Sequence, residues 1–349
     1  MKLARKLNSS LVVQRLALDL GLGHKGKPVE NIVRYCERRI RDFMNGYPEC
    51  ATLADMLDWV ASKVGTSFIE VATDADLNEV KNDYLARGEM RFVELADFLA
   101  KEDDFGVTFR LRNREPWELE FVSVIDCRDN KSVRAYFTKW HEIAHLMTQT
   151  QQMRFAFRRT HSSDQNPDEE RLMDAIAGRF GFFPSMVHKV IDGDISFEMI
   201  SRLRDTLCPT ASYQSALINL ARFWPSPVIL IRGELGYKRA EERSLDQLDL
   251  GFTNKPRAML RAVHVTPSDN AVENDFTIFP NMRIPEKSII HQVFTAGAGS
   301  DEAEEDLSWW ESSDGWRPRA CPVRVMSRYS WDGVDVLIIP LERLAPLTG

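Results

Sequence analysis

Two histidines and a glutamate at helical spacing are the residues of this chain best suited to metal chemistry. They lie in the segment His141-Glu142-Ile143-Ala144-His145. Residues four apart share one face of a helix, so His141 and His145 can both present an imidazole to one metal ion. Glu142 can reach a water molecule held by that metal. The spacing predicts a hydrolytic zinc (Zn²⁺) site with Glu142 as general base; the alternative is a surface helix with two solvated histidines.

A buried helix is expected to carry these residues. Residues 132–150 contain an apolar stripe at helical spacing, which is formed by Ala135, Tyr136, Trp140, Ile143, Ala144 and Met147. Catalytic zinc takes three protein ligands and keeps one position for water. A third ligand is therefore expected on a second helix further along the chain.

Glu170 is the best candidate for that third ligand. Asn166-Pro167-Asp168-Glu169 is typical of a helix start, with Asn at the cap, Pro at the first helical position and acids in the first turn. In this frame Glu169 falls where a capping box turns a glutamate back on the cap residue, which leaves Glu170 freer. Asp174 lies one turn later and can accept the second N–H of a zinc-bound histidine. Two alternatives stay open: Glu169 is the ligand, or both acids only complement the helix dipole.

The two segments together resemble the ImmA/IrrE family of zinc metallopeptidases. The resemblance is strongest over residues 115–185, weaker from about 50 to 225, and it departs from the family pattern at Met173 and Ile176. The residues that carry it are Phe137-Thr138-Lys139-Trp140-His141-Glu142-Ile143-Ala144-His145, Glu170-Arg171-Leu172-Met173-Asp174-Ala175-Ile176-Ala177 and Pro184.

This resemblance implies a fold, an activity and a partner. The implied fold class is α+β: a helical, zincin-like metallopeptidase domain with a small sheet, followed by a C-terminal α+β GAF-like sensor domain. Members of the family are endopeptidases that cleave a partner repressor, often one with a helix-turn-helix. Cleavage switches on an operon in response to stress, DNA damage or phage infection.

Cys127 is a candidate for a regulatory zinc ligand. It follows a strand-like segment that leads into the expected metal helix. A thiolate there could fill the open zinc position and exclude the water until the strand end moves or the thiol is oxidised. The alternative is a small buried residue in a turn. With a C-terminal sensor-like domain, this placement is similar to that of family members found in anti-phage signalling operons.

A group that stabilises the oxyanion is also expected near the metal. The candidates are Tyr84, Tyr136 and His161. Tyr136 lies five residues before His141, so helical geometry turns it away from the ligand face and favours a core position. His161 lies in the connection over residues 149–165, where it could close over a substrate.

The composition is that of a globular protein outside the membrane. The chain has 349 residues, 44% hydrophobic and 28% charged, which allows two or three domains. No apolar run reaches the length of a membrane helix, and the basic start has no apolar core of a signal peptide behind it. Five scattered cysteines without a C-x-x-C pair favour reduced thiols in a cytoplasm. The net charge of −7 gives no general affinity for nucleic acid.

Three parts are expected along the chain. Residues 1–110 form the helical N-terminal part of the peptidase region, and residues 111–225 form the metallopeptidase core. Residues 226–349, after a Pro-rich break, form the GAF-like regulatory domain. Amphipathic helices are predicted over residues 28–44 and 52–64.

Strands dominate the prediction for the C-terminal part. They are expected at residues 228–231, 262–265, 288–290, 323–326 and 334–339. The acidic segment 297–314 is expected to be a mobile loop. A further strand over residues 118–125 is expected at a sheet edge beside the cleft, where extended substrate can pair with it.

Two other functions are compatible with the sequence. The first is a non-catalytic regulatory protein on a peptidase fold, which has no chemical need for Glu142. The second is a sensor activated by single-stranded DNA, since tryptophans and arginines can stack on and clamp such a strand. Residues 226–349 carry 14 Lys and Arg against 19 Asp and Glu, which favours core tryptophans instead. The residues in question are Trp309, Trp310, Trp316 and Trp331 with Arg317, Arg319, Arg324 and Arg328.

Overall fold

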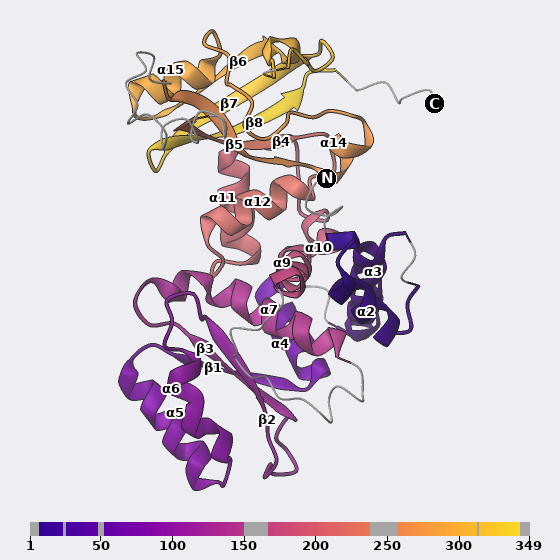
Figure 1. Cartoon of the computed structure of the whole chain (residues 1–349), viewed down its shortest axis with the longest axis vertical. Coiled ribbons are helices and arrows are strands. Elements are labelled where there is room, and N and C mark those ends of the chain that lie inside the picture. The colour runs from indigo at the N-terminus through magenta and orange to yellow at the C-terminus, as the bar shows by residue number, and fades with distance from the viewer. Residues whose placement is uncertain are drawn as a thin grey trace, which may run out of the picture. The chain divides into compact units, whose positions relative to one another are not determined.

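The chain forms a mixed α+β structure that divides into two compact units (Figure 1). The N-terminal unit comprises residues 1–190 and 201–216, and the C-terminal unit comprises residues 191–200 and 217–349. No helix in the described part of the chain is long and apolar enough to cross a membrane. The computed structural model describes residues 7–23, 26–47, 52–149, 167–237, 257–312 and 314–342.

A three-stranded sheet with the order β1-β3-β2 lies in the N-terminal unit. Its strands are β1 (Thr66–Val71), β2 (Gly106–Arg110) and β3 (Phe121–Asp126). β3 pairs with β1 in parallel and with β2 antiparallel. The strand predicted over residues 118–125 is therefore present as β3, but its predicted edge position is wrong. All six residues of β3 are buried, as in a strand covered on both faces, and β2 is an edge strand instead.

Helices surround this sheet in the N-terminal unit. The two amphipathic helices predicted near the N-terminus are confirmed as α3 and α4. A capping box of Thr52 and Asp55 begins α4, and Gly65 with φ +88° ends it and leads directly into β1. The helices of this unit are α2 (Leu11–Asp19), α3 (Pro28–Met44), α4 (Leu53–Val64), α5 (Asp74–Ala86), α6 (Leu95–Phe98), α7 (Ala135–Thr148), α9 (Pro167–Gly181) and α10 (Pro184–Val187).

The helix α7 is the element that joins the sheet to the other helices. It packs against α9, against α3 and α4, and against β2 and β3. The apolar stripe expected on this helix is buried, including Tyr136, Trp140 and Met147. A Cβ atom at Gly106 would lie only 2.8 Å from Cγ2 of Thr138, so β2 approaches α7 at a distance that only glycine allows. This close approach brings the start of β2 beside the first turn of α7.

The C-terminal unit is built on a five-stranded sheet with the order β5-β4-β8-β7-β6. All its strand pairs are antiparallel. Four of the five strands expected in this part of the chain are present. The sheet consists of β4 (Ile229–Gly236), β5 (Met259–Pro267), β6 (Ser300–Asp306), β7 (Pro322–Ser330) and β8 (Gly333–Pro340). The helices α14 (Asp269–Glu273) and α15 (Ile289–Ala296) lie between β5 and β6 in the chain.

Two predictions for the C-terminal unit are wrong. Residues 288–290 begin helix α15 instead of a strand, because the Ser288 hydroxyl caps it by accepting a hydrogen bond from the Ile290 amide. The acidic segment predicted as a mobile loop contains β6, which pairs with β7 over its whole length. An edge strand can carry charged side chains, and Glu304 lies opposite Arg324 in this pair.

The helices α11 (Phe197–Leu207) and α12 (Tyr213–Arg222) complete the described structure. Each contains residues assigned to both units.

Candidate metal centre

The two histidines and Glu170 come together in the N-terminal unit. His141 and His145 lie one turn apart on α7, and Glu170 lies in the first turn of α9. Nε2 of His141 is 3.1 Å from Nε2 of His145 and 3.1 Å from Oε2 of Glu170. One ligand atom from each of the three residues fits within 4.8 Å of the others. The structure thus gathers the ligand set predicted from the sequence, with Glu170 and not Glu169 in it.

The chemistry of these donors fits a divalent cation. Two imidazole nitrogens and a carboxylate oxygen converge on one region, and each can contribute a lone pair. Such a set of two His and one Glu is a common protein ligand set of catalytic zinc, which keeps a fourth position open. A cation bound there would neutralise the Glu170 carboxylate and satisfy both imidazoles at once.

Asp174 orients the first histidine. Its Oδ1 lies 3.0 Å from Nδ1 of His141, on the side of the ring away from the ligand atom. A carboxylate at Nδ1 keeps the proton on that nitrogen and leaves the Nε2 lone pair for a metal. Asp174 stands one turn after Glu170 on α9, so a single helix supplies both the ligand and the residue that supports it.

The charge state of Glu170 also suits a ligand. Burial alone would raise the pKa of its carboxyl group. The hydrogen bonds and charge interactions with His141 and His145 outweigh burial and hold that pKa well below its ordinary value. Glu170 therefore stays ionised across the physiological pH range.

Glu142 lines a cavity together with His141 and Glu170, two of the three candidate ligands. Its side chain is only 2% exposed, and its Oε2 accepts a hydrogen bond from the Thr108 hydroxyl on β2. The cavity has a volume of about 340 Å³. Its walls come from α7, α9 and the segment that leads into β2, and they are formed by Asp103, Asp104, Phe105, Gly106, Arg134, Phe137, Thr138, His141, Glu142, Glu170 and Asp174.

Sequence reasoning missed the contribution of β2 to this site. Gly106 and the acidic pair Asp103 and Asp104 line the cavity, and Thr108 holds Glu142, although none of them belongs to a recognisable motif. The only sequence feature that indicates β2 is the alternation of apolar and polar residues after Gly106, and this segment is too short to distinguish an edge strand from a loop. Their role depends on the close approach of β2 to α7.

The tyrosines considered as oxyanion donors belong to the core. The Tyr136 hydroxyl donates a hydrogen bond to the Gly181 carbonyl oxygen at 2.7 Å, and the residue is buried. Burial also holds its pKa well above the ordinary value. The core interpretation of Tyr136 is therefore the one that the structure supports. Tyr84 stacks on Phe92 with ring centroids 4.2 Å apart and is not among the residues lining the cavity. His161 lies outside the described residues.

Cys127 is not brought to the metal ligands. Its backbone amide donates to the Val71 carbonyl oxygen at 2.9 Å, in the turn that follows β3. The thiol is not part of the metal cluster and does not line its cavity. Burial and the nearby Glu70 carboxylate raise the pKa of the thiol to about 11. In this structure Cys127 is a half-buried, protonated turn residue and not a thiolate ligand.

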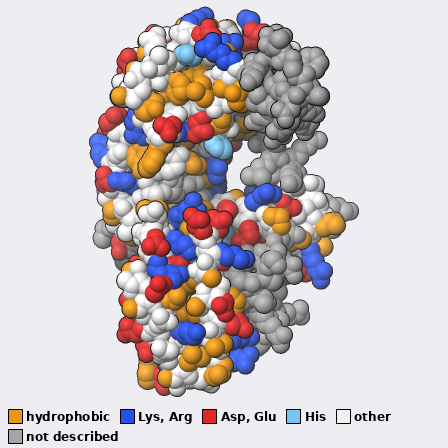
Figure 2. Space-filling model, turned by 60° about the vertical axis from the view of Figure 1, so that its left-hand side comes forward, with side chains coloured by type: hydrophobic (Ala, Val, Ile, Leu, Met, Phe, Trp, Pro, Cys, Tyr) orange, Lys and Arg blue, Asp and Glu red, His pale blue; other side chains and the backbone are white. Residues whose placement is uncertain are grey.

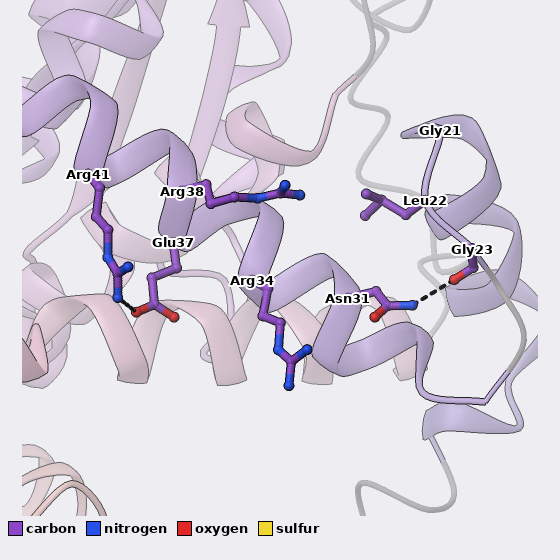
Figure 3. Close-up of a pocket in the computed structure, with 8 residues that line it drawn as sticks. All are labelled: Gly21, Leu22, Gly23, Asn31, Arg34, Glu37, Arg38 and Arg41. Carbon is purple, nitrogen blue, oxygen red and sulfur yellow. Dashed lines mark hydrogen bonds and ion pairs between the residues drawn. The ribbon is translucent and has the colours of Figure 1, made fainter.

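A second hollow, of about 600 Å³, lies against α3 (Figure 3). Arg41 pairs there with Glu37 at 2.6 Å, whereas Arg34 and Arg38 are exposed, line the hollow and form no ion pair with the described residues. The neighbouring Arg39 turns away and donates to the Met147 carbonyl oxygen at 2.8 Å. The arginines of α3 thus differ in role: Arg34 and Arg38 are exposed, whereas Arg39 makes a structural contact with the end of α7.

The tryptophans of the C-terminal unit lie in separate environments. Trp310 is buried in the core, and Trp316 packs on Phe279. The ammonium nitrogen of Lys287 lies over the Trp309 ring, 3.6 Å from the ring centroid. Trp331 is 91% exposed in the turn between β7 and β8. Acidic and basic side chains are interspersed on the face shown in Figure 2. These observations do not favour a stacking surface for single-stranded DNA.

No protein-family model matches the chain, and no curated protein matches it. The function therefore rests on the chemistry of the site itself.

Proposed function

We propose that this chain is a zinc-dependent endopeptidase. The observation that supports this proposal is the position of Glu142, a buried carboxylate that lines one cavity with His141 and Glu170, two members of the cluster of His141, His145 and Glu170. A site that only stores a structural metal has no use for a carboxylate beside its ligands. The N-terminal unit would then be a zincin-like peptidase domain, and the C-terminal unit would be its GAF-like regulatory domain.

In this proposal each polar residue of the site has a distinct task. His141, His145 and Glu170 hold the zinc, and Asp174 keeps His141 in the tautomer that can bind it. Zinc, when bound, supplies a Lewis acid that polarises a peptide carbonyl group and makes a water molecule more acidic. Glu142 takes the proton of the attacking water on its carboxylate and delivers it to the departing amine of the cleaved peptide.

The neighbourhood of the cavity suits an extended polypeptide. β2 pairs with β3 on one side only, so within the described residues its other edge is not paired with a strand. An extended segment of substrate can add to such an edge through main-chain hydrogen bonds. From the resemblance described above, the substrate would be a helix-turn-helix repressor, cleaved under stress, DNA damage or phage infection.

The test compares wild type with Glu142→Gln, which is nearly isosteric and cannot accept the proton of water. Both proteins, loaded with zinc, are incubated with helix-turn-helix proteins encoded beside the gene and with a library of internally quenched peptides. Mass spectrometry and fluorescence identify the products. We expect cleavage by wild type and a loss of at least about 100-fold in Glu142→Gln, in line with general-base catalysis.

Glu79→Gln is the matched control, since it makes the same change at an exposed position on α5. It should cleave like wild type. Turnover of Glu142→Gln within tenfold of wild type would remove Glu142 as the base. Zinc binding without any cleavage by wild type would favour a non-catalytic regulatory protein instead.

A further inference from the structure

Three buried hydroxyl groups form a row across the three-stranded sheet and end at Glu142. The Thr66 hydroxyl on β1 lies 3.0 Å from the Ser123 hydroxyl on β3. The Ser123 hydroxyl lies 2.6 Å from that of Thr108 on β2, and Thr108 donates to Oε2 of Glu142. All four side chains are buried. One residue from each strand therefore takes part in a continuous hydrogen-bonded chain that reaches the cavity.

The pairing of the strands explains how this row forms. Thr108 and Ser123 are direct register partners in the antiparallel pair of β2 and β3, so their side chains stand side by side on one face. Ser123 interrupts an otherwise apolar run in a strand that is buried throughout. A buried hydroxyl costs free energy unless it is hydrogen-bonded, and valine has the shape of threonine without that cost. Packing alone gives no reason for three adjacent hydroxyls here.

The carboxylate of Glu142 fixes the direction of the whole row. An ionised carboxylate only accepts hydrogen bonds, so the hydroxyl proton of Thr108 must point toward Glu142. The Thr108 oxygen then accepts from Ser123, because each hydroxyl has one proton to donate. The Ser123 oxygen is left to accept from Thr66 at 3.0 Å, the nearer of two acceptors for the Thr66 proton; the other is the Ser67 carbonyl oxygen at 3.3 Å. Ser123 and Thr66 thus hold the Thr108 hydroxyl in its donating orientation.

We propose that Thr108 is a positioning residue for Glu142, supported by Ser123 and Thr66. A glutamate side chain has three rotatable bonds, and a charge-assisted hydrogen bond to Oε2 fixes the plane that contains both carboxylate oxygens. Proton transfer requires the base within hydrogen-bonding reach of the water, and a displacement of about 1 Å can cost about 100-fold in rate. This inference rests on the proposed role of Glu142 as the base.

The first test removes the Thr108 hydroxyl and then restores it. Thr108→Val loses the donor at constant shape, and Thr108→Ser keeps it. With the best-cleaved peptide of the quenched library, we expect Thr108→Val to lower kcat by about 10- to 100-fold with KM within about threefold of wild type. Thr108→Ser should stay within about threefold of wild type in kcat. Zinc content should remain close to that of wild type in both variants. The unfolding temperature should be lower in Thr108→Val only, because that variant removes a hydrogen-bond partner of two buried groups, Ser123 and Glu142.

Thr148→Val is the matched control. It removes another buried threonine hydroxyl from the same unit, one that donates to the backbone carbonyl oxygens of Ala144 and His145 on α7. It should leave kcat unchanged. Wild-type kcat in Thr108→Val would overturn the inference, as would a loss in Thr108→Ser equal to that in Thr108→Val. Loss of zinc from Thr108→Val would assign Thr108 to the fold of the site instead.

A second measurement does not depend on cleavage. Crystal structures of wild type and Thr108→Val should show the Glu142 carboxylate in one orientation in wild type and displaced or spread over several rotamers in the variant. An unchanged Glu142 in Thr108→Val would overturn the positioning role even if wild type cleaves no peptide. Conversely, inactivity of wild type with a displaced Glu142 in the variant would contradict the proposed function and retain the positioning contact.

Discussion

Glu170 combines two tasks, since it is both a candidate ligand and the counter-charge of two imidazoles. Its oxygens lie 3.1 Å from Nε2 of His141 and 3.5 Å from Nε2 of His145. Removing it leaves two imidazoles without a carboxylate between them. We therefore expect Glu170→Ala to bind zinc at least about 100-fold more weakly, because one of three ligands is lost.

The matched control at this position is Glu169→Ala. It removes the preceding acid of α9, which is not part of the metal cluster. It should keep about one zinc per chain and lose at most about 1 kcal/mol of stability from a weakened helix start. Metal content by mass spectrometry separates the two variants. The reverse pattern would show that Glu169, and not Glu170, is the third ligand.

The row of hydroxyls has an acceptor at each of its ends. Thr66 also lies 3.3 Å from the Ser67 carbonyl oxygen, at the end opposite to Glu142. When Glu142 has taken up a proton it can donate, and the three hydroxyls can then turn around so that Thr66 donates to Ser67. Both forms of Glu142 are thus satisfied by rotation of hydroxyl protons, without any movement of the heavier atoms.

At the scale of elements, the approach of β2 to α7 shapes the cavity. A Cβ atom at Gly106 would lie 2.8 Å from Cγ2 of Thr138 and 3.3 Å from Cδ1 of Ile125. Gly106→Ala should therefore destabilise the N-terminal unit by about 1–3 kcal/mol through overpacking. Denaturant unfolding measures this change. Thr138→Ser removes the methyl group in question, so the double variant should regain part of the loss.

A matched glycine checks that the effect is steric. A Cβ atom at Gly23 would meet nothing within 4 Å, so Gly23→Ala should be close to neutral. Equal stability of Gly106→Ala and wild type would show that β2 can move away from α7 at little cost.

The helices of the site could be predicted from the sequence, whereas its strands could be predicted only in part. The four-residue spacing of His141 and His145 and the one-turn step from Glu170 to Asp174 are local properties of helices, and the structure places these residues as expected. The pairing of Thr108 with Ser123 depends on which strand lies at the edge, which is a property of the whole sheet. Glu142 could therefore be predicted as the base from its place on a helix, whereas its hydrogen-bond partner Thr108, which lies on a strand, could not.

The prediction of a mobile loop over residues 297–314 is wrong for a related reason. The acidic segment that forms β6 has no apolar alternation, because its side chains are mostly exposed at the edge of the sheet. Its pairing with β7 supplies the backbone hydrogen bonds that a loop would have to find elsewhere. An edge strand of this kind has the composition of a loop, and only its neighbour in the sheet distinguishes the two.

At the scale of the whole molecule, the candidate metal centre belongs to one of two compact units. All three candidate ligands lie on α7 and α9, within the N-terminal unit. A ligand that binds only the folded state stabilises the part of the molecule that folds around it, by about 2.7 kcal/mol when its free concentration is 100 times Kd. Removing zinc with a chelator should therefore lower the unfolding temperature of the N-terminal unit and leave β7 and β8 unaffected.

Hydrogen–deuterium exchange can resolve this difference along the chain. Chelation should increase the exchange of amides in α7 and α9, while amides of the β7–β8 pair in the C-terminal unit serve as the internal reference. Glu170→Ala, which should not retain the ion, is expected to exchange like chelated wild type and to show no further change with the chelator. Equal protection of α7 and α9 in wild type with and without the chelator would mean that His141, His145 and Glu170 do not hold an ion in the folded chain.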